Sequence, residues 1–220
     1  MPGKLTYFDV NGRADCIRMM LNHAGAQYED CRLSFPQFGE MKQQGCFPMG
    51  SVPVWDEDGF CMPDGCAILR MLAIRHGYYS DKPMIIHNID SIVDFAEGLM
   101  KPWSTYTAPL LGGGALADDE KADEFINKYV KELVRVVGAR LDGHGKKFIA
   151  GTDRPTIADF KAFTNLSTAM SDMNPASAFP ESVQTKIKST CMAHDGFKRW
   201  VMGMKQECST LLANRPARPV

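Results

Sequence analysis

The sequence lacks the marks of several large classes of protein. It has no CxxC or Cys/His pair at the spacing of zinc ligands, and its five histidines form no HxxxH or HExxH pairing. Its longest apolar runs fall far short of the roughly 20 residues that a membrane-spanning helix needs. Basic and acidic residues number 25 and 26, and neither sign forms a long block. These absences argue against a metal site, a membrane span and binding to nucleic acid.

The cysteines also lack a regular pattern. They are odd in number and scattered, at positions 16, 31, 46, 61, 66, 191 and 208. This argues against a disulfide framework and indicates reduced thiols. The opening stretch MPGKLTYF has no signal-peptide apolar core. We therefore expect a soluble, cytoplasmic protein whose partner is a small molecule or another protein.

The first 80 residues carry alternating strand and helix signals. Residues 4–8 predict a strand, residues 13–25 a helix that Gly25 ends, and residues 26–35 an extended segment. Together they have the length of a βαβ unit. A polar stretch over residues 36–50 shows no regular pattern. The beginning of the chain is thus predicted to be a small α/β domain.

A hairpin signal follows, in which SVPVW (51–55) and FCM (60–62) flank the turn DEDG, before a helix predicted over residues 65–76. Val52-Pro53 marks a special position in the first of these strands, because proline cannot donate a hydrogen bond to a ladder. Two arrangements remain open. One is an edge strand with a trans proline, and the other is a cis bond, which about one X-Pro bond in twenty adopts.

The second half shows helical patterns only. The predicted helices cover residues 85–100, 118–141, 156–170 and 181–194. GYYSDKP, residues 77–83, is the expected linker, so we predict an α/β domain over residues 1–78 and an all-helical domain over residues 84–220. Thr156 and Asp159 have the spacing of a capping box, to which we assign a structural and not a catalytic role.

Four motifs match one family in order and spacing: YFDVNGRADCIRMML, GSVPVW, AILRMLA and FIAGTDRPTIADF. They resemble the cytosolic glutathione transferases that use tyrosine, and look closest to the sigma class. The resemblance covers nearly the whole chain. It implies a thioredoxin-like N-terminal domain, an all-helical C-terminal domain and a homodimer. It also implies glutathione as co-substrate and, between the domains, an acceptor site for a small-molecule electrophile, with Val10 and Tyr106 as walls.

The resemblance gives Tyr7 a catalytic role, although a tyrosine in such a strand is otherwise a core aromatic. A free thiol has a pKa near 8.5, so only about 3% is thiolate at pH 7. Lowering that pKa by about 2 units takes roughly 2.7 kcal/mol. One hydrogen bond to a charged group contributes about 1.5 to 3 kcal/mol, so the Tyr7 hydroxyl could supply most of the shift. Arg13 matches the family position whose positive charge supports the thiolate, and is otherwise a helix-surface residue.

The resemblance also assigns further single residues of this sequence to the glutathione site. The backbone of Val52, next to Pro53, matches the residue that pairs with the cysteinyl part of glutathione, and a cis Pro53 would present it. Lys42 matches a basic residue that reaches the glycyl carboxylate. Phe38 stands where the sigma class usually has tryptophan, and Ser51 where a longer glutamine or lysine is common.

Asp64-Gly65 departs from the family, which usually has Gln-Ser or Gln-Thr before this helix. Gly65 retains the backbone N–H that holds the γ-glutamyl carboxylate but lacks the hydroxyl, a loss of about 1.5 to 3 kcal/mol. Asp64 adds a negative charge, and two like charges about 5 Å apart repel by about 3 kcal/mol at an effective dielectric near 20. Together the two changes would weaken binding roughly a thousandfold. Alternatively, Asp64 pairs with the ammonium of glutathione, or it is simply a helix N-cap.

Two functions follow. The first is an enzyme that conjugates the glutathione thiolate to apolar electrophiles, favoured by Tyr7, Arg13 and Val52-Pro53. The second is a protein with the same fold but weakened catalysis, which serves a structural role or joins a larger protein assembly, favoured by Asp64-Gly65. We prefer the enzyme.

Overall fold

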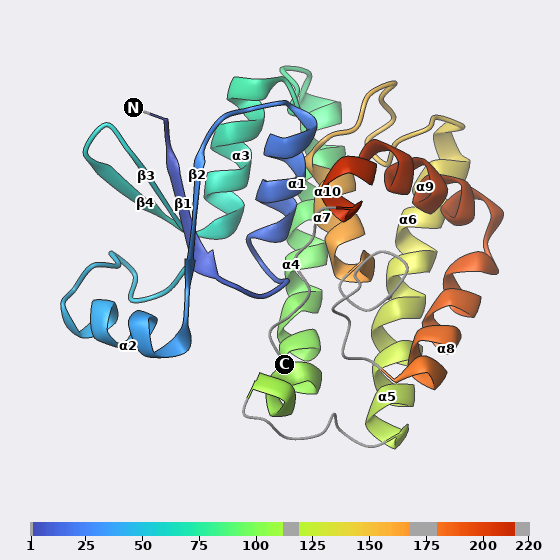
Figure 1. Cartoon of the computed structure of the whole chain (residues 1–220). Coiled ribbons are helices and arrows are strands. Elements are labelled where there is room, and N and C mark those ends of the chain that lie inside the picture. Colours follow the sequence, from blue (N-terminus) through green and yellow to red (C-terminus); the bar gives the residue numbers. More distant parts are fainter. Residues whose placement is uncertain (1, 112–118, 168–179, 214–220) are drawn as a thin grey trace.

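A four-stranded mixed sheet forms one side of the protein in the computed structural model, which describes residues 2–111, 119–167 and 180–213 (Figure 1). Its strands are β1 (Lys4–Phe8), β2 (Glu29–Leu33), β3 (Val54–Glu57) and β4 (Phe60–Pro63). The order is β2-β1-β3-β4, with β1 parallel to β2 and antiparallel to β3. β3 and β4 are antiparallel, as the hairpin signal predicts.

Two helices cover the face of the sheet that is turned toward the rest of the protein (Figure 1). They are α1 (Asp15–His23), which joins the parallel strands β1 and β2, and α3 (Gly65–His76). Their apolar residues, including Ile17 and Leu69, are fully buried in the main core. The predicted βαβ unit and the helix over residues 65–76 are thus confirmed.

One N-terminal helix differs from the sequence prediction, in which residues 36–50 show no regular pattern. The structure has α2 (Phe35–Gln43) there, apart from the other helices (Figure 1). Ser34 caps it with Gln37 in a capping box, a signal that is visible in the sequence. The helix bears no fully buried residue, and this is why its hydrophobic pattern is weak.

The hairpin turn has the backbone that its sequence predicts. Asp58 and Gly59 both have positive φ, 51° and 83°, as a two-residue hairpin turn of type I′ requires. β3 begins only after Pro53, so the proline does not interrupt the ladder. The Val52-Pro53 bond is cis, which decides between the two arrangements left open by the sequence.

The remainder of the described chain has helices joined by irregular segments and no strand, as predicted. It comprises α4 (Pro83–Leu111), α5 (Asp119–Phe125), a π-helical segment (Ile126–Val130), α6 (Lys131–His144), α7 (Ile157–Ser167), α8 (Glu181–Met192), α9 (Asp195–Glu207) and α10 (Ser209–Ala213). The single helix expected over residues 118–141 is therefore divided by a π-helical segment, and α9 and α10 were not foreseen. The fold class is the expected one, a thioredoxin-like domain followed by helices only.

Helix α7 lies at the centre of the molecule and is buried along its whole length. Asp159 anchors its first turn, because its carboxylate accepts hydrogen bonds from the backbone N–H groups of Ile149 and Thr156, the Thr156 hydroxyl and the indole N–H of Trp200. The structural role predicted for Thr156 and Asp159 is confirmed. α7 packs against α1 and α4 and so joins the two parts of the protein.

Candidate active site

A cleft of about 520 Å³ lies between the N-terminal domain and α4. Its walls are Arg13, Ser51, Val52, Pro53, Asp64, Gly65, Cys66, Arg70, Asp94 and Glu97. The loop before α1, the segment before β3 and the first turn of α3 meet here. All the predicted site residues between positions 51 and 65, together with Arg13, are therefore brought to one place.

Tyr7 lies on β1, next to Arg13 of the cleft wall. Its side chain is 7% exposed, and it is not itself on the cleft wall. Its hydroxyl accepts a hydrogen bond from the backbone N–H of Arg13, with N and O 3.3 Å apart. Burial raises the pKa of Tyr7, while the Arg13 N–H acts in the opposite direction. The net pKa lies above the usual 10, so the hydroxyl keeps its proton at neutral pH and can donate a hydrogen bond to an anion.

Gly12 leaves the room that this hydroxyl needs. A Cβ atom added at Gly12 would lie 2.7 Å from the Tyr7 hydroxyl oxygen, well inside contact distance. The position of the hydroxyl therefore depends on a glycine in the loop between β1 and α1.

Arg13 belongs to a charged cluster that crosses from the N-terminal domain to two C-terminal helices. Its Nε donates to Glu97 Oε1 on α4 at 2.8 Å, and Lys161 Nζ on α7 donates to Glu97 Oε2 at 2.5 Å. Burial by itself raises the pKa of Glu97, but the charges and hydrogen bonds of Lys161 and Arg13 outweigh it. The net pKa of Glu97 is lowered, so its carboxylate is ionised at neutral pH.

Asp64 and Gly65 form the other end of the cleft, where α3 begins. Asp64 is the N-cap of α3: its carboxylate accepts the backbone N–H of Ala67 at 2.8 Å, and its φ is 72°. The N-cap interpretation is confirmed, and the carboxylate also lines the cleft. Gly65 lies close to the cis proline: a Cβ atom added there would lie 3.1 Å from Pro53 Cγ.

The remaining residues predicted for the site are not among those that line this cleft in the described part of the chain. Phe38 on α2 stacks on Phe47, with ring centroids 5.3 Å apart, and Lys42 Nζ lies 5.7 Å from the Phe38 ring. Neither lines the 520 Å³ cleft. Val10 is half-buried at the edge of the main core. Tyr106 lies on α4, and its side chain is outside the described residues.

The sequence reading missed four residues of the cleft, namely Cys66, Arg70, Asp94 and Glu97. Arg70 binds Asp90 and Asp94 on α4 at 2.7 and 2.5 Å. No local pattern links these partners, which are about 20 residues apart, although Asp94 and Glu97 have the i, i+3 spacing that places two residues on one helix face. Burial raises the pKa of Cys66 to about 11, so its thiol is protonated.

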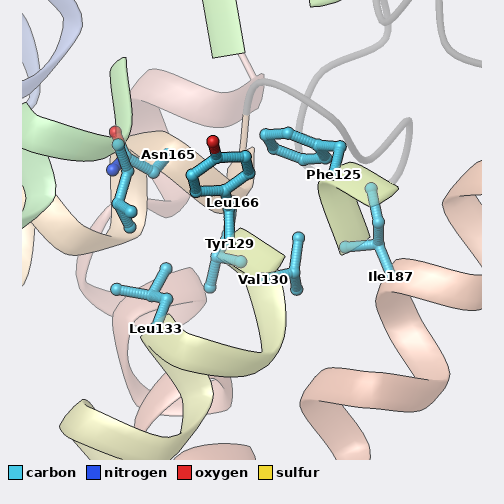
Figure 2. Close-up of a pocket in the computed structure, with 8 residues that line it drawn as sticks. Phe125, Tyr129, Val130, Leu133, Asn165, Leu166 and Ile187 are labelled. Atoms are coloured by element: carbon cyan, nitrogen blue, oxygen red, sulfur yellow. The ribbon is translucent and has the colours of Figure 1, made fainter. Parts of the chain in front are cut away.

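A second cavity lies inside the helical part, among α4, α5, the π-helical segment, α6, α7 and α8 (Figure 2). Its walls are apolar except for Asn165 and Tyr129, and the Asn165 Oδ1 atom has no hydrogen-bond partner among the described residues. The volume is about 20 Å³, which has room for about one water molecule. This cavity is too small to be an acceptor site for an organic electrophile.

Comparison with known proteins identifies the family. No family model matches the chain. The S-crystallin SL20-1 of Nototodarus sloanii is 30% identical over 194 residues, which cover 80% of this chain and 86% of the relative. The chain belongs to the glutathione S-transferase family. A class-mu 28 kDa glutathione S-transferase of Schistosoma mansoni is 32% identical over 170 residues, 71% of this chain and 73% of the relative.

Solved structures of glutathione S-transferases have the same fold as this transferase. The glutathione S-transferase of Ascaris lumbricoides superposes with a TM-score of 0.81 at 23% identity, with both chains covered completely. Within the ranges that the structure describes, this transferase has no cluster of three or more His, Cys, Asp or Glu residues able to hold a metal ion. No helix in those ranges is long and apolar enough to cross a membrane.

Proposed function

We propose that this glutathione transferase binds glutathione in the 520 Å³ cleft and uses Tyr7 to activate the thiol for attack on apolar electrophiles. The proposal is carried by the buried, protonated Tyr7 hydroxyl, which the Arg13 N–H fixes beside the cleft. A hydroxyl that already accepts one hydrogen bond and retains its own proton is suited to donate to a sulfur anion.

The reaction requires glutathione in its thiolate form, and the protein can provide this by stabilising the anion, without a strong base that removes the proton. The glutathione thiol loses its proton to solvent, and the Tyr7 hydroxyl donates a hydrogen bond to the sulfur anion that remains. The anion then attacks the electrophilic carbon, so that a carbon–sulfur bond forms and a leaving group departs or a conjugated double bond takes up a proton. One charge-assisted hydrogen bond of about 1.5 to 3 kcal/mol shifts the thiol pKa by about 1 to 2 units.

The rest of glutathione is proposed to lie along the remaining cleft wall. The backbone of Val52 pairs with the cysteinyl residue beside the cis proline, with Ser51 next to it. The first N–H groups of α3, at Gly65 and beyond, receive the γ-glutamyl carboxylate, because a helix N-terminus favours an anion. Lys42 and Phe38 are proposed to meet the glycyl end, and Val10 and Tyr106 the electrophile.

The domain boundaries and the assembly are also proposals. We place the domains at residues 1–78 and 84–220, supported by Gly77, which ends α3 in the left-handed conformation, and by Pro83, which begins α4. We propose a cytoplasmic homodimer. Support comes from large apolar side chains that are more than half exposed on the loop before β3, on β4, on α3 and at the start of α4, namely Met49, Phe60, Ile74 and Met84.

Calorimetry combined with a conjugation assay tests this function. Glutathione is titrated into the protein, with S-methylglutathione as a matched ligand that has no ionisable thiol. We expect both to bind, and only glutathione to release a proton on binding and to be conjugated to a chromogenic aryl halide. No heat with either ligand at millimolar concentration, together with no conjugation, would contradict the proposal and leave a structural or assembly role.

A further inference from the structure

Lys161 is a buried amine that the proposed chemistry does not yet use. It lies on α7, is 2% exposed, and donates to Glu97 Oε2 at 2.5 Å. An ammonium is costly to bury unless a counter-charge accompanies it. Its counter-charge Glu97 lies on the cleft wall and is also the partner of Arg13.

The charges of this cluster do not cancel. Arg13 and Lys161 are positive and Glu97 is negative, so the three residues together carry one positive charge. If the cluster held only Arg13 and Glu97, the pair would be neutral, and the charge that Arg13 presents to the cleft would be offset by its own partner. Lys161 is therefore the residue that leaves the cluster positive.

The other groups around Lys161 do not alter this count. The titratable groups that face it are Cys16 on α1, Cys66 on α3 and Glu97 on α4. Burial raises the pKa of both thiols, that of Cys66 to about 11, so both are neutral at physiological pH. Asp159, on the same helix, is held by its four hydrogen bonds, and α9 faces that carboxylate with the uncharged Trp200.

We propose that Lys161 sets the charge at the thiol end of the cleft: it balances Glu97, so that the positive charge of Arg13 remains free to hold the glutathione sulfur in its anionic form. The proposal rests on the proposed function above. Lys161 is a positioning residue, because it acts through Glu97 and Arg13 and does not itself line the cleft.

Three variants separate a role of charge from a role of shape. Lys161→Met removes one positive charge, Lys161→Arg keeps it, and Lys161→Met combined with Glu97→Gln removes one charge of each sign. The readouts are the pH dependence of kcat/KM and the ultraviolet absorbance of the thiolate in bound glutathione. Removing a unit charge at a separation on the order of 10 Å shifts a titration by about one pH unit at a dielectric of about 20.

We expect Lys161→Met to raise the midpoint of both titrations by about one pH unit. Lys161→Arg should keep the wild-type midpoint, and the double variant should return to it, because its net charge equals that of the wild type. The double variant leaves no unpaired buried charge, so it also provides the test if Lys161→Met alone does not fold. Lys146→Met is the matched control, since it breaks a lysine–carboxylate pair with Asp153 on the surface and should change neither titration.

The two proposals fail in different ways. If wild-type protein binds glutathione and forms the thiolate, but Lys161→Met keeps the same midpoint, the role of Lys161 is overturned alone. The same conclusion follows if the double variant is shifted as far as Lys161→Met, because that result indicates shape and not charge. If the thiol of glutathione in the presence of the wild type titrates no lower than the thiol of free glutathione, the proposed function is overturned, and the role of Lys161 with it.

Discussion

The two ends of the cleft are built differently. One end, here called the thiol end, is the part of the cleft lined by Arg13 and Glu97, where we propose that the glutathione sulfur binds. Tyr7 and Lys161 are buried next to it, and Arg13 forms a hydrogen-bonded ion pair with Glu97 on α4. The other end, here called the far end, is the part lined by Ser51, Asp64 and Gly65. Ser51 and Asp64 are exposed there, and the N-cap Asp64 stabilises the first turn of α3. The thiol end thus depends on the packing of the whole molecule, whereas the far end depends on local backbone geometry.

We expect the two ends to control different properties: the thiol end controls the activation of the thiol, and the far end controls the affinity for glutathione. Under the proposed function, Tyr7 and Arg13 at the thiol end activate the bound thiol, so this step should be intact. The far end carries the Asp64-Gly65 departure, so the tightness of peptide binding should be the property that differs. Substitutions at the two ends should accordingly change different kinetic parameters.

The largest effect is expected at the thiol end, from Tyr7→Phe. Loss of one hydrogen bond to the sulfur anion should lower kcat/KM about twentyfold at pH 7, because the thiolate fraction falls to that of a free thiol, and leave the affinity for glutathione nearly unchanged. Steady-state assays and calorimetry measure the two quantities. Tyr28→Phe is the control, because that ring packs on Trp55 outside the cleft. A rate equal to that of the wild type would remove Tyr7 from the mechanism.

At the far end, Gly65→Ser and Gly65→Ala form a matched pair. Both add the Cβ atom that meets Pro53, but only serine adds the hydroxyl. We expect the serine variant to bind glutathione about tenfold more tightly than the alanine variant, because its hydroxyl can donate one additional hydrogen bond to the γ-glutamyl carboxylate. Calorimetry gives the ratio. Equal affinities would show that a hydroxyl at this position does not reach the ligand.

Gly12→Ala tests whether the thiol end depends on the exact position of the hydroxyl. The added Cβ atom would displace the Tyr7 hydroxyl from its present place, so kcat/KM should fall about fivefold. Gly39→Ala is the control, since nothing lies within 4 Å of its added Cβ atom. Retention of full activity in Gly12→Ala would mean that the hydroxyl tolerates displacement.

Asp64 tests the local character of the far end through stability. Asp64→Ala removes the N-cap at a residue with positive φ, and should lower the free energy of unfolding by about 1 kcal/mol. Asparagine can also cap the helix and tolerates a positive φ, so Asp64→Asn should change that free energy by only a few tenths of a kcal/mol. Urea denaturation distinguishes them. Equal destabilisation by both substitutions would argue that the charge of Asp64 matters more than its cap.

The smallest effect concerns the dependence of stability on pH. The pKa of Glu97 is lower in the folded protein than its ordinary value of about 4.3, because Lys161 and Arg13 outweigh the effect of burial. The unfolded chain therefore takes up this proton first, and the stabilisation is present at neutral pH and lost as the pH falls below about 4.3. Glu97→Gln should lack this part of the acid destabilisation in denaturation curves. An unchanged slope between pH 5 and pH 3 would contradict the lowered pKa.

The parts of the fold that could be predicted are those whose signal is local. The strand over residues 4–8, the turn at Asp58-Gly59 and the helix over residues 65–76 each carry their own periodicity or turn residues. Helix α2 was missed because it lies on the surface and buries little, so its apolar spacing is weak. The Ser34 capping box would have revealed it.

For the candidate site, the sequence by itself determined which chemical groups are present: a tyrosine on the first strand, an arginine after it, a Val-Pro pair, and an acid with a glycine before the third helix. The tertiary structure decided which groups act together. Glu97 and Lys161 are 84 and 148 residues from Arg13 along the chain, and only the packing of α4 and α7 against α1 brings their charges to one point. Burial then fixes the protonation of Tyr7 and Glu97, because solvation depends on neighbours that no local pattern encodes.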